Sequence, residues 1–320
     1  MEKYTKKCLV TGGAGFIGSH LCDSLIKKGY EVFCVDNLLT GNKRNITHLL
    51  ENPRFHFYFH DVTKPFSKTY SSEFSSLSYI YHLASPASPS KYRKYSLETM
   101  MVNSIGTRYM LELTKKLKAS FLFTSTSEVY GDPLEHPQKE TYFGNVNPIG
   151  VRACYDEAKR FGEALTMEYI RKNDLNARIV RIFNTYGPRM DPDDGRVIIN
   201  FINQAASGKI LTIYGNGKQT RSFCYITDMI GGIIASMETE NTKGRVINLG
   251  YPKEYTIKQI AEIILRLTHS TSTYKYFDKQ EDDPTRRRPD ISLAKKLLGW
   301  QPKTDLFNGL AKTIDYFKSL

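Results

Sequence analysis

The stretch KKCLVTGGAGFIGSHLCDSLIKKGYEVFCVDN, residues 6–37, decides the fold of this chain. Apolar residues run into a cluster of glycines, a helical pattern covers 16–28, and Gly29 precedes a second apolar run at 31–37. A strand, a glycine turn, a helix and another strand in this order predict the first unit of a parallel sheet.

The glycine turn TGGAGFIG, residues 11–18, has the spacing of a dinucleotide-binding loop. Gly12, Gly15 and Gly18 would allow a tight turn, close approach of the backbone to a pyrophosphate, and close packing of the helix on the strand. The amino-terminal end of the following helix attracts phosphate groups. A bound dinucleotide is therefore predicted.

Asp36, at the end of the second predicted strand, indicates which dinucleotide. A carboxylate there can accept hydrogen bonds from both ribose hydroxyls and would repel a 2′-phosphate, which favours NAD over NADP. Lys43 and Arg44 lie nearby in the sequence and weaken this preference.

The rest of the first half continues the alternation of strands and helices. Further strand patterns lie at 54–61, 79–85, 120–127 and 177–184, and long helical patterns lie at 98–118 and 153–172. This alternation predicts an α/β protein with a Rossmann-type, doubly wound parallel sheet that carries helices on both faces.

After Asn184 the chain becomes rich in turns, at 185–195 and 215–223. We expect an NAD-binding domain at 1–184, with 226–250 returning to it, and a smaller α/β substrate-binding domain at 185–320. Helical patterns in this second part lie at 255–268 and just before Gly299.

The segments TSTSEVYG (124–131) and YDEAK (155–159) carry chemically useful side chains. Thr126 and Glu128 follow a buried strand, and Tyr155 and Lys159 share one face of a helix because they are four residues apart. A second YxxxK match, Tyr214 to Lys218, spans two glycines that disfavour a helix.

Tyr155 is the candidate base. A free tyrosine has a pKa near ~10. The Lys159 ammonium and a bound nicotinamide cation are expected to lower the pKa of Tyr155, so that it can accept a proton from a sugar hydroxyl.

Composition excludes several classes of protein. Of the 320 residues, 40% are apolar and 24% are charged, as in globular proteins, and no apolar run is long enough to cross a membrane. MEKYTKK is too short for a signal peptide, so a cytoplasmic protein is expected. The net charge of +12 comes without a nucleic-acid-binding motif, and the clusters at 91–94 and 286–288 suit a small anionic substrate better.

The five cysteines and seven histidines show no metal-ligand spacing, so no metal site is predicted. Buried free thiols are expected, because most of the cysteines lie in apolar patterns. His82, in the strand pattern YIYHLAS, is interpreted as a hydrogen-bonded core residue.

The glycine turn, Thr126 and the YxxxK motif together resemble the extended short-chain dehydrogenase/reductase superfamily, which acts on nucleotide sugars. Within it the chain resembles the UDP-glucuronate decarboxylases, or UDP-xylose synthases, from about residue 7 to Trp300. The resemblance is carried by TSTSEVYGDP (124–133), GNVNPIGVRACYDEAKR (144–160), RIFNTYGPRMDPDDGRV (181–197), QTRSFCYITDM (219–229) and DDPTRRRPDI (282–291).

This resemblance implies a reaction. Tyr155, assisted by Thr126 and Lys159, would take the proton from the sugar 4-hydroxyl as hydride passes to NAD. The resulting ketone lies β to the C6 carboxylate, so carbon dioxide can leave. Protonation at C5 and return of the hydride then give UDP-xylose and regenerate the cofactor.

The resemblance also assigns roles to residues. Glu128 is the candidate acid, base or ring-positioning group, and Arg287 is the candidate partner of the carboxylate or the enolate. The implied cofactor contacts are Gly12, Gly15, Phe16, Ile17, Gly18, Asp36, Asn37, Asp61, Val62, Leu83, Ala84, Tyr155 and Lys159. The implied substrate contacts are Pro86, Ser127, Glu128, Asn184, Arg196, Arg221, Tyr225 and Arg287.

Three departures within the superfamily bear on the choice of reaction. The related 4,6-dehydratases have an Asp-Glu pair where this chain has Ser127-Glu128, which removes the acid expected to expel the 6-hydroxyl. Residues 93–96 replace the usual Tyr-Asn-Pro of the substrate loop, and Ser85 stands where many members have cysteine. The last two bear on how the carboxylate is recognised.

Two alternatives remain open. A UDP-glucuronate 4-epimerase, or another nucleotide-sugar epimerase or dehydratase of the superfamily, would share the glycines, Tyr155 and Lys159. A non-catalytic dinucleotide sensor could keep the glycines yet lose the proton-transfer residues, which are all present here. The resemblance also implies a homodimer formed through the helices at 98–118 and 153–172.

Overall fold

The computed structural model describes residues 6–278 and 286–319, so residues 281–285 of the charged loop predicted at 281–290 lie outside them. Its strands are β1 (Lys7–Thr11), β2 (Glu31–Asp36), β3 (Phe55–Phe59), β4 (Leu77–His82), β5 (Ser120–Thr126), β6 (Ala177–Ile182), β7 (Thr185–Tyr186), β8 (Leu211–Tyr214), β9 (Thr220–Arg221), β10 (Cys224–Tyr225), β11 (Val246–Leu249), β12 (Tyr255–Thr256), β13 (Tyr274–Phe277) and β14 (Arg286–Arg287).

Its α-helices are α1 (Phe16–Lys27), α2 (Lys68–Glu73), α3 (Pro89–Lys94), α4 (Ser96–Met101), α5 (Thr107–Leu117), α6 (Ala153–Asn173), α7 (Val197–Ala206), α8 (Ile226–Glu238), α9 (Ile257–Thr268), α10 (Ser292–Leu298) and α11 (Leu306–Lys318). Shorter helical turns are η1 (Lys43–Leu49), η2 (Val102–Gly106) and η3 (Ser127–Tyr130).

Seven strands form one parallel sheet in the order β11-β6-β5-β4-β1-β2-β3. From β1 the chain winds outward to β3, then returns beside β1 and winds the other way from β4 to β11. This is the order of a Rossmann-type sheet, and the predicted fold class is confirmed. Ligands bind such sheets where the winding reverses, at the carboxyl ends of β1 and β4.

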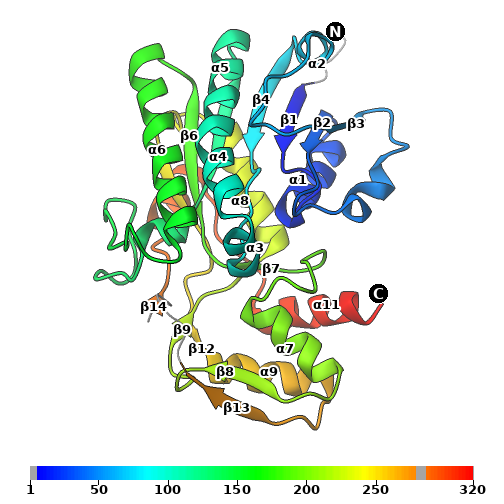
Figure 1. The fold of residues 1–320 in the computed structure, drawn as a ribbon, viewed down its shortest axis with the longest axis vertical. Helices are drawn as coiled ribbons and strands as arrows, with labels where there is room; N and C mark the ends of the chain where they lie inside the picture. Colours follow the sequence, from blue (N-terminus) through cyan, green and yellow to red (C-terminus); the bar gives the residue numbers. More distant parts are fainter. Residues whose placement is uncertain (1–5, 279–285, 320) are drawn as a thin grey trace.

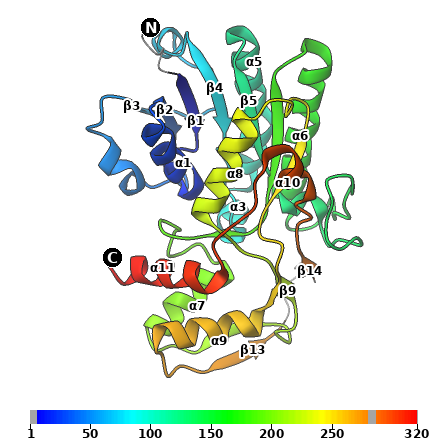
Figure 2. The same cartoon turned by 180° about the vertical axis from the view of Figure 1, so that it is seen from behind.

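Helices cover both faces of the sheet (Figures 1 and 2). α5 and α6 pack on one face, with α4 against α6, while α1 and α8 pack on the other. Because both faces are covered, the three consecutive apolar residues of β5, Phe121 to Phe123, are buried, and of its seven residues only Ser120 is half-buried.

A smaller lobe lies beyond the carboxyl ends of the sheet strands (Figure 1). It contains α7, α9 and α11, the strand pair β8–β13, and the short sheet β12-β9-β14. α9 begins with a capping box: the hydroxyl of Thr256 accepts from the backbone N–H of Gln259, and the Gln259 side chain accepts from the Thr256 N–H.

The structure differs from the predicted elements in three places. The helix predicted at 98–118 begins at Ser96 and contains the wider π-type turn η2, and such turns are frequent at functional sites. Helices α7 and α11 were not predicted, although the buried residues of each recur at helical spacing. α10 packs on α8 and β11, although it falls within the predicted range 185–320.

His82 is a neutral core residue, as predicted. It is buried with Nδ1 2.7 Å from the hydroxyl of Thr11 and Nε2 3.2 Å from that of Thr107. Burial, reinforced by the charge of Lys159, lowers the pKa of His82 to about 3. Four cysteines are buried and Cys154 is half-buried.

The described residues contain no candidate metal cluster and no candidate membrane-spanning helix. Within 6–278 and 286–319, no three His, Cys, Asp or Glu side chains group so as to hold a metal ion. None of the helices in the same ranges is both long enough and apolar enough to cross a membrane.

Candidate active site

A cavity of about 1230 Å³ lies at the carboxyl ends of the sheet strands, between the sheet and the smaller lobe. Residues from both parts line it. Of the predicted contacts, it brings together Gly12, Gly15, Phe16, Ile17, Gly18, Asp36, Asn37, Asp61, Val62, Leu83, Ala84, Pro86, Thr126, Ser127, Glu128, Tyr155, Lys159, Asn184, Arg196, Arg221 and Arg287.

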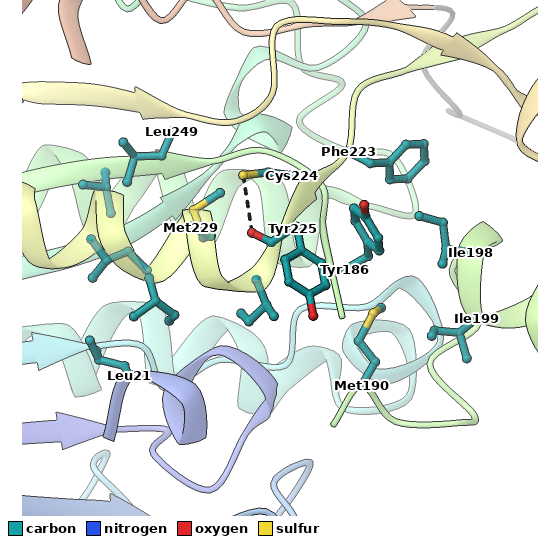
Figure 3. Packing of buried hydrophobic residues seen from close by; sticks show 14 of the residues in the cluster. Leu21, Tyr186, Met190, Ile198, Ile199, Phe223, Cys224, Tyr225, Met229 and Leu249 are labelled. Atoms are coloured by element: carbon teal, nitrogen blue, oxygen red, sulfur yellow. Dashed lines mark hydrogen bonds between the residues drawn. The ribbon is translucent and has the colours of Figure 1, made fainter. Parts of the chain in front are cut away.

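Tyr225 is the one predicted contact that does not line this cavity. Its ring packs in the core between the lobes, 5.6 Å from that of Tyr186, and Figure 3 shows both beside Met190. Pairing of β10 with β7 carries the Tyr225 side chain into this cluster. The prediction that Tyr225 contacts the nucleotide therefore has no support in the geometry.

The glycine loop leaves no room for side chains. A Cβ on Gly18 would lie 2.1 Å from the carbonyl oxygen of Gly12, and one on Gly12 would lie 2.8 Å from the backbone of Ala84. Gly12 also has a positive φ of 70°, which glycine tolerates best. The amino-terminal end of α1 is thus bare backbone facing the cavity, which fits a dinucleotide pyrophosphate.

Asp36 supports this loop from the end of β2. Its carboxylate accepts hydrogen bonds from the backbone N–H groups of Ala14 (3.0 Å) and Leu38 (2.8 Å). Burial raises the pKa of Asp36 and these two bonds lower it. The carboxylate lines the cavity, where ribose hydroxyls could reach it. Lys43 and Arg44 are exposed, and Arg44 also lines the cavity.

Tyr155 and Lys159 project from the first turns of α6 and are both buried. The Lys159 ammonium donates to the carbonyl oxygen of Thr124 (2.8 Å) and lies 4.9 Å from the centre of the Phe123 ring. Burial lowers the pKa of Lys159 to about 7, and the charge of Glu163 opposes this shift. The ammonium lies 5.9 Å from the centre of the Tyr155 ring.

The protein alone does not lower the pKa of Tyr155; the expected lowering also involved a bound nicotinamide cation. Burial raises the pKa of this phenol, a hydrogen bond with the side chain of Thr126 lowers it, and the charge of Glu128 raises it. Lys159, whose own pKa burial lowers to about 7, does not reverse this. Burial therefore favours the protonated phenol in the protein alone.

Glu128 is held between two arginines. One carboxylate oxygen accepts from the guanidinium of Arg287 and the other from that of Arg152. Burial would raise the pKa of Glu128, but the charges of Arg287 and Arg152 outweigh it and lower the pKa to about 2. Glu128 is therefore a carboxylate at neutral pH and not a proton donor.

The three arginines at 286–288 lie in different environments. Arg287 is 2% exposed, lines the cavity, and also donates to the carbonyl oxygen of Gly131 (3.0 Å). Arg288 lies 3.6 Å from Glu254 and Arg286 is exposed. The alternating strand β14 explains this, because successive side chains point to opposite sides.

Arg152 and Tyr92 were missed by sequence reasoning. Arg152 stands at the N-cap of α6, three residues before Tyr155, so the helical spacing could have indicated it. The ring of Tyr92, on α3, stacks on that of Tyr155 with centres 5.0 Å apart and planes 4° apart. No spacing in the sequence signals that contact.

Arg196 and Asn184 line the cavity on the side of the smaller lobe. The guanidinium of Arg196 pairs with Asp194, and its Nη2 lies 2.7 Å from a carboxylate oxygen. Arg221 lies near enough to Glu128 for its charge to contribute to the low pKa of that carboxyl. The cavity thus has acidic and basic groups at its centre and cationic side chains toward the smaller lobe.

The chain matches known proteins along nearly its full length. A family model described as GDP-mannose 4,6 dehydratase matches residues 9–313. UDP-glucuronic acid decarboxylase 1 of Arabidopsis thaliana is 50% identical over 313 residues, which are 98% of this chain and 70% of that protein. UDP-glucuronic acid decarboxylase 6 of the same plant is 51% identical over 305 residues, 95% of this chain and 86% of that protein.

This chain belongs to the UDP-glucuronic acid decarboxylase family. Among solved structures, the UDP-glucuronic acid 4-epimerase of Bacillus cereus in complex with UDP-glucuronic acid and NAD is similar to it, with a TM-score of 0.88 and 33% identity. That comparison covers 98% of this chain and 99% of the epimerase chain. Decarboxylases and epimerases therefore share this fold.

In this member of the decarboxylase family, replacing Gly18 with alanine should weaken dinucleotide binding. The new methyl would lie 2.1 Å from a backbone oxygen, so the loop must move. Overpacking of this kind costs ~1–3 kcal/mol, so we expect the Kd for NAD to rise about tenfold or more. Fluorescence titration with NAD measures it.

Gly231→Ala is the matched control, because a Cβ there would meet nothing nearer than 3.8 Å. It lies on α8, away from the loop. An unchanged Kd for Gly18→Ala would show that the glycine loop does not approach the dinucleotide.

Proposed function

We propose that this chain decarboxylates UDP-glucuronate to UDP-xylose through a UDP-4-keto sugar, with NAD regenerated in every turnover. The observation that carries the proposal is the pair of arginines, Arg152 and Arg287, gathered on Glu128 in the cavity that also contains Tyr155. Buried guanidiniums beside a sugar-oxidising tyrosine suit an anionic sugar.

The glycine loop, Asp36 and the residues after β3 and β4 would hold NAD, since they line one end of the cavity around the amino-terminal end of α1. When bound, NAD supplies a hydride acceptor for C4 of the sugar and a positive charge that lowers the pKa of Tyr155. Asn37, Asp61, Val62, Leu83 and Ala84 form the walls of this end.

Tyr155 accepts the proton of the sugar 4-hydroxyl and later returns it. Thr126 hydrogen-bonds to the phenol and favours its ionised form, because this bond lowers the pKa of Tyr155 against the larger rise that burial causes. The ammonium of Lys159, which donates to the carbonyl oxygen of Thr124, contributes positive charge at the bottom of the site. Stacking on Tyr92 fixes the ring plane of Tyr155.

The 4-ketone makes decarboxylation possible, because the C6 carboxylate then lies β to a carbonyl. The C5–C6 bond breaks, carbon dioxide leaves, and the electron pair passes into an enolate that ends on the C4 oxygen. Arg287 and Arg152 stabilise the negative charge in this step. Glu128, ionised throughout, positions the two guanidiniums.

Ser127 favours this outcome over dehydration. It lines the cavity beside Glu128 and offers a neutral hydroxyl where a dehydratase needs an acid to expel a 6-hydroxyl. A carboxylate at Ser127 would also repel the carboxylate of the sugar.

The nucleotide part of the substrate would lie toward the smaller lobe. Asn184, Arg196 and Arg221 are suitable partners for its diphosphate and sugar groups, and Pro86 for the sugar ring. We accordingly divide the chain into an NAD-binding domain at 1–184, joined by 226–250, and a nucleotide-sugar-binding domain formed mainly by 185–320.

We further propose that the protein is a cytoplasmic homodimer. Leu97, Met101 and Ile105 follow one another at helical spacing on α4 and η2, and the Leu97 side chain is 70% exposed. Phe161 on the neighbouring α6 is 52% exposed. Such an apolar face suits a second copy of the chain. Sedimentation velocity tests this, since a monomer at micromolar concentration would contradict it.

The decisive experiment is an analysis of products. The protein is incubated with UDP-glucuronate and NAD, and carbon dioxide and nucleotide sugars are followed. We expect carbon dioxide and UDP-xylose in equal amounts. UDP-galacturonate without carbon dioxide would show a 4-epimerase instead, and no product at all would favour a sensor.

A further inference from the structure

Asp156 is a buried carboxylate that the proposed reaction does not use. It follows Tyr155 on α6 and is 5% exposed, yet it does not line the cavity. Its Oδ2 lies 3.9 Å from Nε of Arg152, whose Nη2 pairs with Glu128. Its Oδ1 is buried and accepts no hydrogen bond from the described residues.

The groups that face Asp156 come from four elements. On α6 and its N-cap these are Arg152, Cys154, Tyr155 and Glu157; the others are Glu128 on η3, Arg287 on β14 and Tyr92 on α3. Arg93 on α3 lies close enough to this cluster for its charge to lower the pKa of Tyr92 and that of Cys154.

The central charges of this cluster balance before a substrate enters. Arg152 and Arg287 are cations, and Glu128 and Asp156 can both be anions; Arg221, whose charge also reaches Glu128, is assigned to the diphosphate of the substrate. A sugar carboxylate that enters beside the arginines adds one negative charge to a poorly solvated place. Such a site resists excess charge, so one carboxylate is expected to take up a proton.

Of the two carboxylates, Asp156 is the one that can take up the proton. Glu128 has a guanidinium on each oxygen and a pKa of about 2, whereas Asp156 touches one guanidinium at the edge of contact distance. Burial, and then the charge of Glu128, raise the pKa of Asp156 to about 7, and Arg152 and Arg287 oppose this. Entry of a further anion can only raise it more.

We propose that Asp156 is a positioning residue that takes up one proton as the carboxylate of UDP-glucuronate enters, which frees Arg152 to serve that carboxylate and Glu128. This rests on the proposed function. Once protonated, Asp156 no longer competes for the guanidinium. A nucleotide sugar without a carboxylate brings no such charge and causes no proton uptake. Asp156 thus couples proton uptake to the presence of a carboxylate on the sugar.

The proton balance of the reaction agrees with this assignment. Decarboxylation converts R–COO⁻ and one proton into R–H and carbon dioxide, as C5–C6 breaks and C5–H forms. The proton that C5 takes up neutralises the negative charge that the sugar carboxylate brought. Asp156 then returns to its ionised state. One proton is therefore taken up when the substrate binds, and one proton is consumed in each turnover.

The test is calorimetric titration of the NAD-loaded protein in two buffers of different ionisation enthalpy. A Tyr155→Phe background prevents turnover. At pH 8 we expect uptake of roughly one proton with UDP-glucuronate and none with UDP-xylose. Asp156→Asn in the same background should abolish the uptake, and Glu157→Gln, its neighbour on α6, should not.

The affinity for UDP-glucuronate should follow the same linkage. Because the bound state holds one more proton, affinity is highest below pH about 7 and falls up to about tenfold per pH unit above it. In Asp156→Asn, which mimics the protonated carboxyl, affinity should stay high and nearly flat across this range. Affinity for UDP-xylose should be flat in both.

An uptake that persists in Asp156→Asn, or an equal pH slope, would overturn the inference. If Asp156→Asn in this background does not fold, the Tyr155→Phe protein alone decides the question. The absence of proton uptake with UDP-glucuronate at pH 8 would overturn the inference equally. Release of carbon dioxide by the wild-type protein separates the two hypotheses. With release but no uptake only this inference fails, and without release the proposed function fails.

Discussion

Replacing Tyr155 with phenylalanine is expected to reduce kcat on UDP-glucuronate by about 10²–10⁴-fold, the usual contribution of a positioned acid or base. The phenol is the group that the structure places beside Thr126, and stacking on Tyr92 would keep the phenylalanine ring in place. Binding of NAD and of UDP-glucuronate should therefore change little. Stopped-flow absorbance of reduced NAD and release of carbon dioxide measure the effect.

Tyr169→Phe is the matched control for this change. Tyr169 lies on the same helix, and its hydroxyl donates to Glu112 away from the cavity. It should turn over at the wild-type rate. Full activity of Tyr155→Phe would refute the proposed mechanism even though the fold is established.

Replacing Arg287 with methionine should lower kcat/KM for UDP-glucuronate by about 10²–10³-fold. Removing one partner of a buried pair leaves the other charge uncompensated, which typically costs ~3–5 kcal/mol. The variant loses the guanidinium that would face the carboxylate, and Glu128 loses the largest influence that lowers its pKa. Initial rates at several substrate concentrations measure this loss.

Arg288→Met serves as the control, since that side chain is half-buried and faces Glu254 instead of the cavity. It should retain nearly full kcat/KM. Equal losses in the two variants would show that Arg287 has no special place in the site.

Arg287→Met should also change how the stability of the fold depends on pH. The folded-state pKa of Glu128 is about 2, below its ordinary value of 4.5, so its ion pairs stabilise the fold fully above pH 4.5 and this stabilisation is lost as pH falls toward 2. In Arg287→Met much of this contribution is missing at every pH. The difference in Tm should thus be largest above pH about 5 and shrink at lower pH.

Much of the fold could be predicted because it follows from patterns of residues close together in the sequence. The strands of the sheet are apolar runs with turn residues between them, and the glycine loop has a spacing that few other structures require. α7 and α11 were not predicted, although each buries residues that recur at helical spacing, so the signal was present in the sequence. The place of Tyr225 outside the cavity lining could not be predicted, because a motif does not show to which side a two-residue strand turns its side chain.

The sequence by itself determined the doubly wound sheet, the dinucleotide loop and the pairing of Tyr155 with Lys159. These depend on short-range spacing along the chain, and backbone geometry converts such spacing directly into position. Only the tertiary structure decided that Glu128 is held by Arg152 and Arg287, that burial favours the protonated phenol of Tyr155, and that Asp156 is buried behind the site. Those properties depend on burial and on charges brought together from distant segments, because the cost of an ion is set by what surrounds it in space.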